Sequence, residues 1–230
     1  MSTLAVDIGG GSIKLLALND QGAPVAEPLS RPTPSPAEPD AVFALIHDMA
    51  QTLPPHRRVS VGFPGVVKRG VAQNAPNLGD ALWRGSNLNE RLTNLLQRPV
   101  RAVNDADLQG LGVVAGKGVE LVLTLGTGMG SALFTDGVLL PNLELGHHPL
   151  RDGQTYEDLV RDSELKRIGP VAWSARVLNA IEQLAPIFNY DTLHLGGGNV
   201  LNLQAELPDK ARLFSLAEAM RGALKLWDGV

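Results

Sequence analysis

The stretch Asp7-Ile8-Gly9-Gly10-Gly11-Ser12 lies between two short apolar runs, and the pattern recurs in Thr124-Leu125-Gly126-Thr127-Gly128-Met129-Gly130. At an offset of 117 residues, Leu4 aligns with Leu121 and Gly9 aligns with Gly126. Turn residues close both segments, at 19–22 and at 135–137. The repeat predicts one β-hairpin used twice, each with bare glycine backbone at its tip. Two such loops facing each other would clamp a phosphate chain.

The first glycine loop carries further groups that suit a phosphate ligand. Its N–H groups can form an anion-binding nest, with the Ser12 hydroxyl and the Lys14 charge nearby. Asp7 precedes the glycines, where a carboxylate would hold a hydrated Mg²⁺. The alternative is a tight hairpin without a ligand. The spacing matches neither a Walker A loop nor a dinucleotide fingerprint, and the duplication favours the phosphate interpretation.

Composition limits the classes of protein. The chain has 230 residues, 44% of them hydrophobic, which is enough for one large or two small domains with real cores. The formal net charge is −4, which argues against a broad nucleic-acid-binding surface. There are no cysteines, so disulfides and thiolate metal sites are excluded. Signal-peptide and membrane-span patterns are missing, so we expect a soluble cytoplasmic protein that binds neither nucleic acid nor membrane.

Strand and helix patterns alternate along the chain. The segment 28–40 contains five prolines and predicts an extended loop, after which Asp40 would cap a helix. The further strands are predicted at 59–62, 98–103 and 192–195, and the helices at 41–53, 88–96, 105–115, 173–184 and 213–226. This alternation predicts α/β layering with parallel strand pairs. Together with the repeat, it predicts two similar lobes joined near Val103, with a cleft between them.

The segment Val100-Arg101-Ala102-Val103-Asn104-Asp105 runs from a strand into a helix. Side chains at that point project from the edge of the sheet where ligands bind in α/β proteins. Asp105 would then be a general base, and Asn104 would orient a hydroxyl substrate. Asn and Asp are also ordinary helix N-caps, and the segment alone favours the cap.

Two later segments carry groups that suit a sugar or a nucleotide. In Glu144-Leu145-Gly146-His147, the acidic residue and the histidine are three apart and can hold sugar hydroxyls, although a surface acid and an exposed histidine are equally ordinary. Glu157 is either a further hydroxyl acceptor or a charge at a helix start. The run Gly196-Gly197-Gly198 after a strand would bring backbone close to an adenosine, or would simply be a turn.

Taken together, these segments resemble the ROK family of sugar kinases and repressors, most closely its polyphosphate/ATP glucokinase branch. The matching motifs occur in family order over residues 4–200: Asp7–Lys14, Gly62–Gly65, Asn104–Asp107, Leu125–Ala132, Glu144–His147 and Leu195–Gly198. The resemblance implies a two-lobed actin-like, ribonuclease-H-like ATPase fold with duplicated mixed sheets and a central cleft. The implied parts are a small lobe at 1–103, a large lobe with the sugar site at 104–212, and a C-terminal helix at 213–230 that packs back on the small lobe.

The resemblance also implies a role for each site residue. Asp105 would be the catalytic base for the 6-hydroxyl of glucose or a related hexose, and Asp7 would lie near Mg²⁺, holding it through water. The implied sugar ligands are Gly65, Asn104, Glu144, His147 and Glu157. The implied phosphate ligands are Gly9, Gly10, Gly11, Ser12 and Lys14 in the first loop, and Gly126, Thr127, Gly128 and Gly130 in the second. Gly196, Gly197 and Gly198 would line the nucleotide.

The chain departs from the family pattern in ways that bear on the donor. Many members carry a Cys-rich zinc motif after the Glu-x-Gly-His segment, whereas this chain has none, so no structural zinc is expected. The segment 199–209 is short and leaves less surface for adenosine. The donor is therefore ATP or inorganic polyphosphate, the latter helped by the basic residues Lys14, Lys68, Arg69 and Arg84. The alternatives are a sugar-binding sensor without kinase activity and a kinase of a different substrate class. A homodimer is expected on family grounds.

Overall fold

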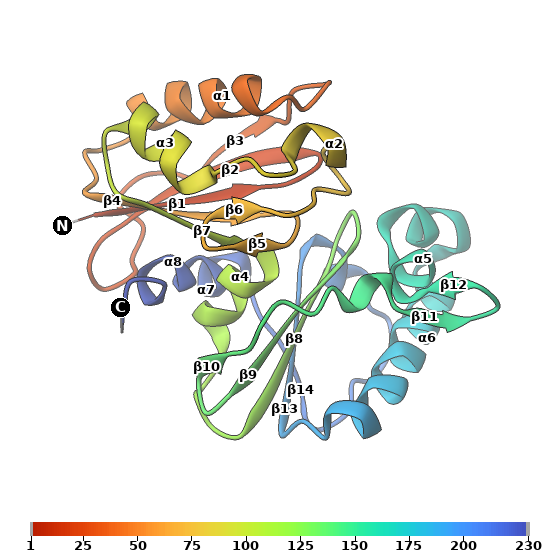
Figure 1. The fold of residues 1–230 in the computed structure, drawn as a ribbon. Coiled ribbons are helices and arrows are strands. Elements are labelled where there is room, and N and C mark those ends of the chain that lie inside the picture. Colours follow the sequence, from red (N-terminus) through yellow and green to blue (C-terminus); the bar gives the residue numbers. More distant parts are fainter. Residues whose placement is uncertain (1, 229–230) are drawn as a thin grey trace. The chain divides into compact units, whose positions relative to one another are not determined.

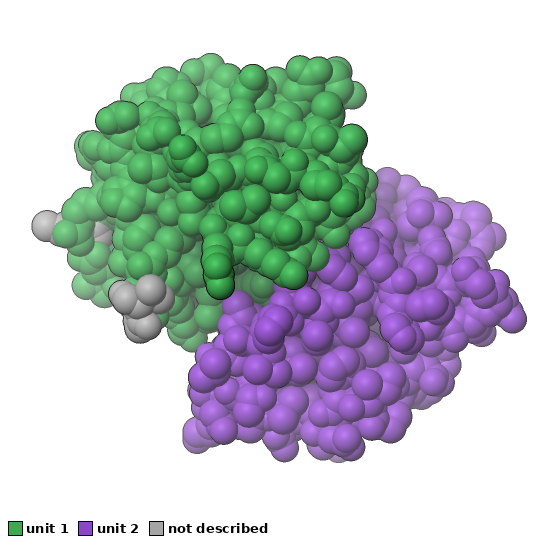
Figure 2. Space-filling view, in the orientation of Figure 1, with its two compact units in different colours: residues 1–112, 220–230 green, residues 113–219 purple. Residues whose placement is uncertain are grey.

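The computed structural model describes residues 2–228, which form two compact units. Unit 1 comprises the chain up to Gly112 together with the segment from Met220 onward, and unit 2 comprises Val113–Ala219 (Figure 2). The sequence placed the first boundary at residue 103 and a separate C-terminal element at 213–230. The compact units divide later in the chain, at Gly112 and Met220. Residues 1 and 229–230 of the predicted segments lie outside the described residues.

Unit 1 is built on a mixed five-stranded sheet (Figure 1). Its order is β3-β2-β1-β4-β7, with antiparallel pairing from β3 to β1 and parallel pairing from β1 to β7. The strands are β1 Thr3–Ile8, β2 Ser12–Leu18, β3 Leu29–Pro32, β4 Arg58–Phe63 and β7 Val100–Asn104. The two parallel pairs bring the carboxyl ends of β1, β4 and β7 to one edge of the sheet.

Helices cover both faces of this sheet. On one face, Val42 and Ile46 of α1 and Leu92 of α3 pack in one core with Leu4 and Val6 of β1. On the other face, buried apolar side chains of the C-terminal segment pack against Ala5, Leu16 and Leu18. Because both faces are buried, the strands read as nearly continuous apolar runs. The helices are α1 Pro39–Gln51, α2 Asp80–Trp83, α3 Leu88–Leu96, α4 Asp105–Val113 and α8 Gly222–Lys225, beside the small ribbon of β5 Val67–Lys68 and β6 Val71–Ala72.

Unit 2 repeats the same sheet topology. Its order is β10-β9-β8-β13-β14, antiparallel from β10 to β8 and parallel from β8 to β14. The strands are β8 Val119–Leu125, β9 Met129–Thr135, β10 Val138–Leu139, β13 Thr192–Gly196 and β14 Ala211–Leu213. The matching strand order and directions confirm the predicted α/β class with duplicated mixed sheets.

The remaining elements of unit 2 follow β10 along the chain, and the last of them, α7, ends where unit 1 resumes. One core combines Leu121 and Leu123 of β8 with Leu159 of α5 and Trp173 and Ile181 of α6. The elements are η1 Leu145–His147, β11 Pro149–Arg151, β12 Gln154–Thr155, α5 Tyr156–Val160, α6 Asp162–Phe188, η2 Gly198–Asn202 and α7 Leu216–Met220.

The two predicted hairpins exist, but their loops differ in length. Ile8 pairs with Ile13 in the first hairpin, whereas Leu125 pairs with Met129 in the second. The second loop is therefore one residue shorter, and the offset of 117 holds only for the first strand of each hairpin. The partner of Leu121 is Leu133, while the equivalent Leu4 pairs with Ala17 rather than Leu16.

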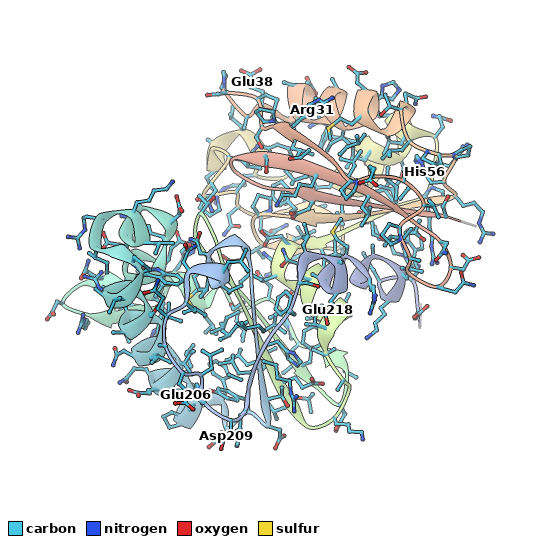
Figure 3. The ribbon with its side chains drawn as sticks, turned by 180° about the vertical axis from the view of Figure 1, so that it is seen from behind. Arg31, Glu38, His56, Glu206, Asp209 and Glu218 are labelled. Carbon is cyan, nitrogen blue, oxygen red and sulfur yellow. The ribbon has the colours of Figure 1, made fainter. Side chains whose placement is uncertain are left out.

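Several element predictions were wrong in detail. A strand, β3, forms within the proline-rich segment that was predicted as a loop. Glu38, labelled in Figure 3, is the N-cap of α1 in place of Asp40, because Pro39 occupies the first helical turn. The helix predicted at 173–184 lies within α6, in which the non-helical Gly169 (φ = 79°) separates a helical stretch that begins at Asp162 from one that ends at Phe188. The final helix predicted at 213–226 is two short helices, α7 and α8.

Within residues 2–228, no helix is both long and apolar enough to cross a membrane.

Candidate active site

Asn104 lies at the junction of β7 and α4 and is buried. Its Oδ1 accepts hydrogen bonds from the N–H groups of Ala106 (2.9 Å) and Asp107 (3.2 Å). These N–H groups belong to the first helical turn and have no acceptor within the helix itself. Its Nδ2 donates to the Gly65 carbonyl at 3.2 Å. Asn104 therefore caps α4 and also fixes the loop that follows β4. Its contact with a sugar stays a prediction.

Asp105 is the first residue of α4 and is half-buried. Its Oδ1 accepts a hydrogen bond from the Ala106 N–H at 2.9 Å. Gly62 of β4 allows this close approach, since a Cβ on Gly62 would lie 3.2 Å from the Asp105 Cα. The carboxylate thus lies at the carboxyl edge of the parallel strands β4 and β7, where α/β proteins bind ligands.

Gly65 is required by packing within unit 1. A Cβ there would lie 2.4 Å from the Asn74 carbonyl oxygen, and the Asn74 Oδ1 accepts a hydrogen bond from the Val66 N–H at 2.7 Å. The structure thus brings Gly65, Asn104 and Asp105 together. Asn74, which fixes this loop, was missed because a lone Asn in an irregular segment has no distinctive sequence signal.

The first glycine loop is a tight hairpin tip. The Gly9 N–H donates to the Ser12 carbonyl at 2.9 Å, and the Thr33 hydroxyl donates to the Gly9 carbonyl at 2.6 Å. None of the three glycines has a positive φ. A side chain on Gly9 would nevertheless be blocked, since its Cβ would lie 2.9 Å from the Ser12 carbonyl oxygen. Gly10 is confined by the Asn77 carbonyl oxygen, 3.1 Å from an added Cβ, whereas Gly11 faces open space. Since the Gly9 amide is engaged within the tip, a phosphate would meet other donors of this loop.

Asp7 and Lys14 form an ion pair beside this loop. Lys14 Nζ lies 3.5 Å from Asp7 Oδ2, and the two residues face each other across the paired strands β1 and β2. Burial raises the pKa of Asp7, and Lys14 opposes that rise. Mg²⁺ is commonly held by one or two carboxylates together with substrate phosphates, so a single carboxylate beside a phosphate loop fits that ion.

Three acidic and basic side chains gather in unit 2. His147 Nδ1 lies 3.7 Å from Glu144 Oε2 across the short η1 helix. Burial raises the pKa of Glu144, His147 lowers it and the charge of Glu157 raises it. Glu144 adopts φ = 47°, a conformation that is uncommon for a residue with a side chain and is often found at functional sites. The structure thus brings together Glu144, His147 and Glu157, here called the acceptor cluster.

The second glycine loop is held from several sides. The Gly126 N–H donates to the Gly128 carbonyl at 3.0 Å, which closes the tip. The Gly126 carbonyl accepts hydrogen bonds from the Asp162 N–H and the Asn199 Nδ2, both at 3.0 Å. The Met129 N–H donates to Glu157 Oε2 at 3.0 Å. Asn199 was missed by the sequence reasoning, although its place directly after three glycines was a usable signal.

The third glycine run has a packing reason for its first two members. A Cβ on Gly196 would enter the Phe214 ring, and Gly197 has φ = 90° and lies against the backbone of Leu125. Gly198 faces open space. Packing alone therefore accounts for Gly196 and Gly197, and the role of this run toward a nucleotide stays a prediction.

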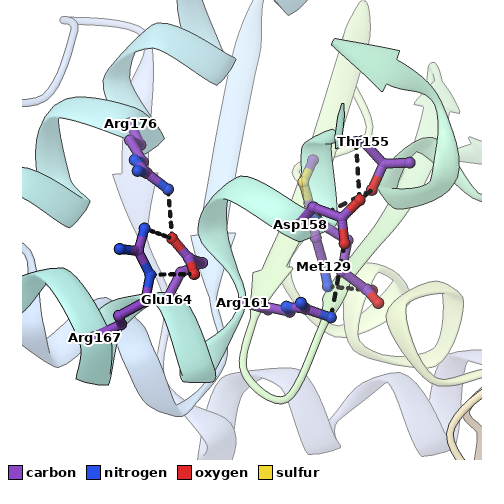
Figure 4. A network of polar contacts seen from close by, with 8 residues as sticks. Met129, Thr155, Asp158, Arg161, Glu164, Arg167 and Arg176 are labelled. Atoms are coloured by element: carbon purple, nitrogen blue, oxygen red, sulfur yellow. Dashed lines mark hydrogen bonds and ion pairs between the residues drawn. The ribbon is translucent and has the colours of Figure 1, made fainter. Parts of the chain in front are cut away.

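Helices α5 and α6 begin in a network of polar contacts (Figure 4). Thr155 and Asp158 form a reciprocal capping box at the start of α5. Glu164 pairs with Arg167 and Arg176, and these arginines lower the pKa of its carboxyl to about 2. In the part of the chain that the structure describes, no three His, Cys, Asp or Glu side chains are placed to hold a metal ion.

Comparison with known proteins gives concordant matches. The model of the ROK family matches residues 3–156. Polyphosphate glucokinases of Mycobacterium leprae (33% identity over 84% of this chain) and Mycobacterium tuberculosis (37% over 62%) are similar in sequence. The matches span 62% and 56% of those relatives, less than two thirds of their length.

The structural comparison extends over nearly the whole chain. The crystal structure of an inorganic polyphosphate/ATP-glucomannokinase from Arthrobacter sp. strain KM matches with a TM-score of 0.87 and 31% identity, covering 98% of both chains. This match confirms the predicted two-lobed, actin-like fold class.

Proposed function

The chain belongs to the ROK family, and on that premise we propose that it is a hexose kinase. It would transfer a phosphoryl group from ATP or inorganic polyphosphate to the 6-hydroxyl of glucose or a related hexose. The similar proteins include a glucomannokinase and polyphosphate glucokinases, which supports this substrate class.

The observation that carries the proposal is the placement of Asp105. Asn104 caps α4 and ties the Gly65 loop to it, and Gly62 leaves room for the helix start. The Asp105 carboxylate would accept the proton of the sugar hydroxyl as that oxygen attacks the terminal phosphorus of the donor. The bond to the bridging oxygen breaks, and ADP or a polyphosphate shorter by one unit leaves.

The acceptor cluster supplies oxygens and a nitrogen that suit sugar hydroxyls. Glu144, His147 and Glu157 would accept or donate hydrogen bonds to the hexose, together with Asn104 and the Gly65 backbone. Phosphoryl transfer depends on positioning and on charge neutralisation, and these contacts would provide the positioning.

The two glycine loops would bind the donor phosphates, with Ser12 and Lys14 at the first loop and Thr127 at the second. Asp7 would hold a hydrated Mg²⁺, which neutralises phosphate charge when it is bound. Gly11 and Gly126 support this role, since a Cβ on either would face open space and its absence leaves room for a phosphate beside the loop. The Gly126 N–H is engaged within the tip, so a phosphate would meet other donors of the second loop. Gly130 belongs to β9 and would act through the backbone.

The donor preference is part of the proposal. Lys68 and Arg69 remain candidates for tracking a polyanion, whereas Lys14 already pairs with Asp7 and Arg84 with Asp80, so both are weaker ones. Binding of polyphosphate should weaken with salt more steeply than binding of ATP, because more charges are involved. Polyphosphate turnover that is absent at every salt concentration would leave ATP as the donor.

Purified protein with a panel of hexoses and either ATP or polyphosphate provides the direct test, with sugar phosphate as the readout. Asp105→Asn should reduce kcat by roughly 10²–10⁴-fold and leave the fold intact, because a general base is removed without change of shape. Asp48→Asn in α1 is the matched control, since that carboxylate is 79% exposed and lies outside the site. Near-parental turnover by Asp105→Asn would refute the base assignment.

The same panel separates the sensor alternative from the kinase. Hexose binding detected by calorimetry without any sugar phosphate would favour a sensor. We retain the homodimer and the cytoplasmic location as proposals, which size-exclusion chromatography with light scattering and cell fractionation would test.

A further inference from the structure

Glu157 touches the second glycine loop directly. It is the second residue of α5, and its Oε2 accepts the Met129 N–H at 3.0 Å. Met129 is the residue at which β9 begins, immediately after the loop tip. A charged acceptor makes this a stronger hydrogen bond than a neutral one would be.

Two glycines lie beside the same carboxylate oxygen, and Gly128 makes room for it. A Cβ on Gly128 would lie 2.2 Å from Glu157 Oε2, and a Cβ on Gly146 would lie 3.5 Å from it. Gly146 also lies against the Met129 carbonyl, 2.4 Å from an added Cβ. One oxygen of Glu157 therefore sits between the second glycine loop and the η1 turn of the acceptor cluster.

The position of Glu157 is fixed by its neighbours in α5. The Thr155 hydroxyl accepts the Asp158 N–H at 3.2 Å, and the Asp158 carboxylate accepts the Thr155 N–H at 3.1 Å (Figure 4). This capping box defines the first turn of α5 on both sides of Glu157. The side chain thus projects from a preset helix start and not from a free loop.

The two ends of the loop are anchored by different groups. At Gly126, the carbonyl is held by a backbone N–H of Asp162 and by the Asn199 amide. At Met129, the side-chain anchor is Glu157. Loss of Glu157 should therefore release the Met129 end of the loop while the Gly126 end stays in place.

We propose that Glu157 is a positioning residue that links the acceptor cluster to the second glycine loop. One carboxylate oxygen holds the Met129 N–H, and the other accepts a hexose hydroxyl. Hexose binding would then tighten the phosphate loop before the donor arrives. This inference rests on the proposed hexose kinase function, in that the ligands of the two sites are a sugar and a phosphate donor.

Hydrogen exchange tests the positioning role without any substrate. Glu157→Ala should accelerate exchange of the amides at 127–130 by about tenfold, which corresponds to ~1.4 kcal/mol. Glu157→Gln keeps one acceptor oxygen and should restore exchange close to the parental rate. Unchanged exchange in Glu157→Ala, or no rescue by Gln, would overturn the role.

Kinetics then test the link to the two substrates. With hexose saturating, Glu157→Ala should raise the donor KM several-fold, while Glu157→Gln should raise mainly the hexose KM because it has lost one acceptor oxygen. Glu164→Gln, whose carboxylate pairs with arginines outside the acceptor cluster, is the matched control and should leave both KM values unchanged. A parental donor KM in Glu157→Ala would overturn the link.

A failure of the proposed kinase function can be distinguished from a failure of the positioning role of Glu157. If the parental protein phosphorylates no hexose in the panel, the proposed function fails while the exchange experiment still decides the role of Glu157 at the loop. If the parental protein is active and the amides at 127–130 exchange at the same rate in Glu157→Ala as in the parental protein, only the positioning inference fails.

Discussion

The surroundings of Glu144 make its carboxyl group harder to ionise. Burial raises its pKa above the ordinary value of 4.5, His147 opposes the rise and the charge of Glu157 adds to it. The folded protein therefore holds this proton more tightly than the unfolded chain does. The resulting stabilisation is fully present below pH 4.5 and is lost as the pH rises through the elevated folded pKa.

Replacing this group should change how stability depends on pH. Glu144→Gln cannot ionise, so its stability relative to the parental protein should improve as the pH rises from about 4 to 7. Thermal unfolding at a series of pH values measures this, and Glu182→Gln, an exposed glutamate, controls for the loss of a surface charge. A stability difference that is constant across this range would contradict the predicted coupling.

At the residue scale, the sequence indicated candidate site residues, but it did not indicate the structural role that several of them have. Asn104 was expected to be either a helix cap or a sugar ligand. The structure shows the cap, and contact with a sugar stays a prediction. Gly196 and Gly197 were assigned to a nucleotide, yet both have packing reasons. Asn199 was missed although it follows three glycines, because its partner, the Gly126 carbonyl, is distant in sequence. Asn74 was missed because a lone Asn in an irregular segment has no distinctive pattern.

At the scale of the element, glycines of the glycine-rich tips differ in whether packing requires them or whether they leave room for a ligand. Gly126 has open space where a Cβ would go, whereas Gly197 has φ = 90° and would place its Cβ 2.3 Å from the Leu125 carbonyl oxygen. Gly126→Ala should therefore leave the free energy of unfolding nearly unchanged and raise the donor KM, since a methyl group would obstruct a phosphate.

The matched substitution Gly197→Ala should cost about 1–3 kcal/mol of stability, because strain at positive φ adds to the clash. Urea unfolding of both variants, together with donor titration, provides the measurement. Equal destabilisation by the two alanines would show that the second loop is as tightly packed as the third, and would remove this support for a phosphate role.

Elements were predictable where local signals agreed. The helix at 88–96 was predicted with its observed bounds because Asn87 caps it, accepting the Glu90 N–H, and its apolar residues recur at helical spacing. The first part of α6 was not predicted, and Gly169, whose φ of 79° is not helical, separates it from the helical stretch that was predicted. Strand β3 was missed because of its prolines, which an edge strand tolerates.

At the scale of the whole molecule, the chain leaves unit 1 after Gly112 and returns to it at Met220. The hairpin repeat predicted the duplication because two matching sheets need two matching strand patterns. The return was expected only from the family resemblance, since the pattern at 213–226 predicted a helix but not the sheet on which it packs. The returning segment is fixed by polar contacts as well: Ser60 donates to the Ala223 carbonyl at 2.6 Å, and Trp227 Nε1 donates to Ser60 Oγ at 2.8 Å.

This return should make unit 1 depend on residues at the far end of the chain. Met220 is 3% exposed and packs with Ala5, Leu16 and Leu18, so Met220→Ala should lower the free energy of unfolding by about 2–5 kcal/mol. Leu216→Ala in the same short helix is the control, because Leu216 is 47% exposed and its loss should stay within about 0.5 kcal/mol. Hydrogen exchange should then accelerate in β1 and β2 of unit 1 more than in β8 and β13 of unit 2. A uniform acceleration in both units would mean that they unfold as one cooperative body, and an effect of Met220→Ala no larger than that of Leu216→Ala would mean that the returning segment contributes little to unit 1.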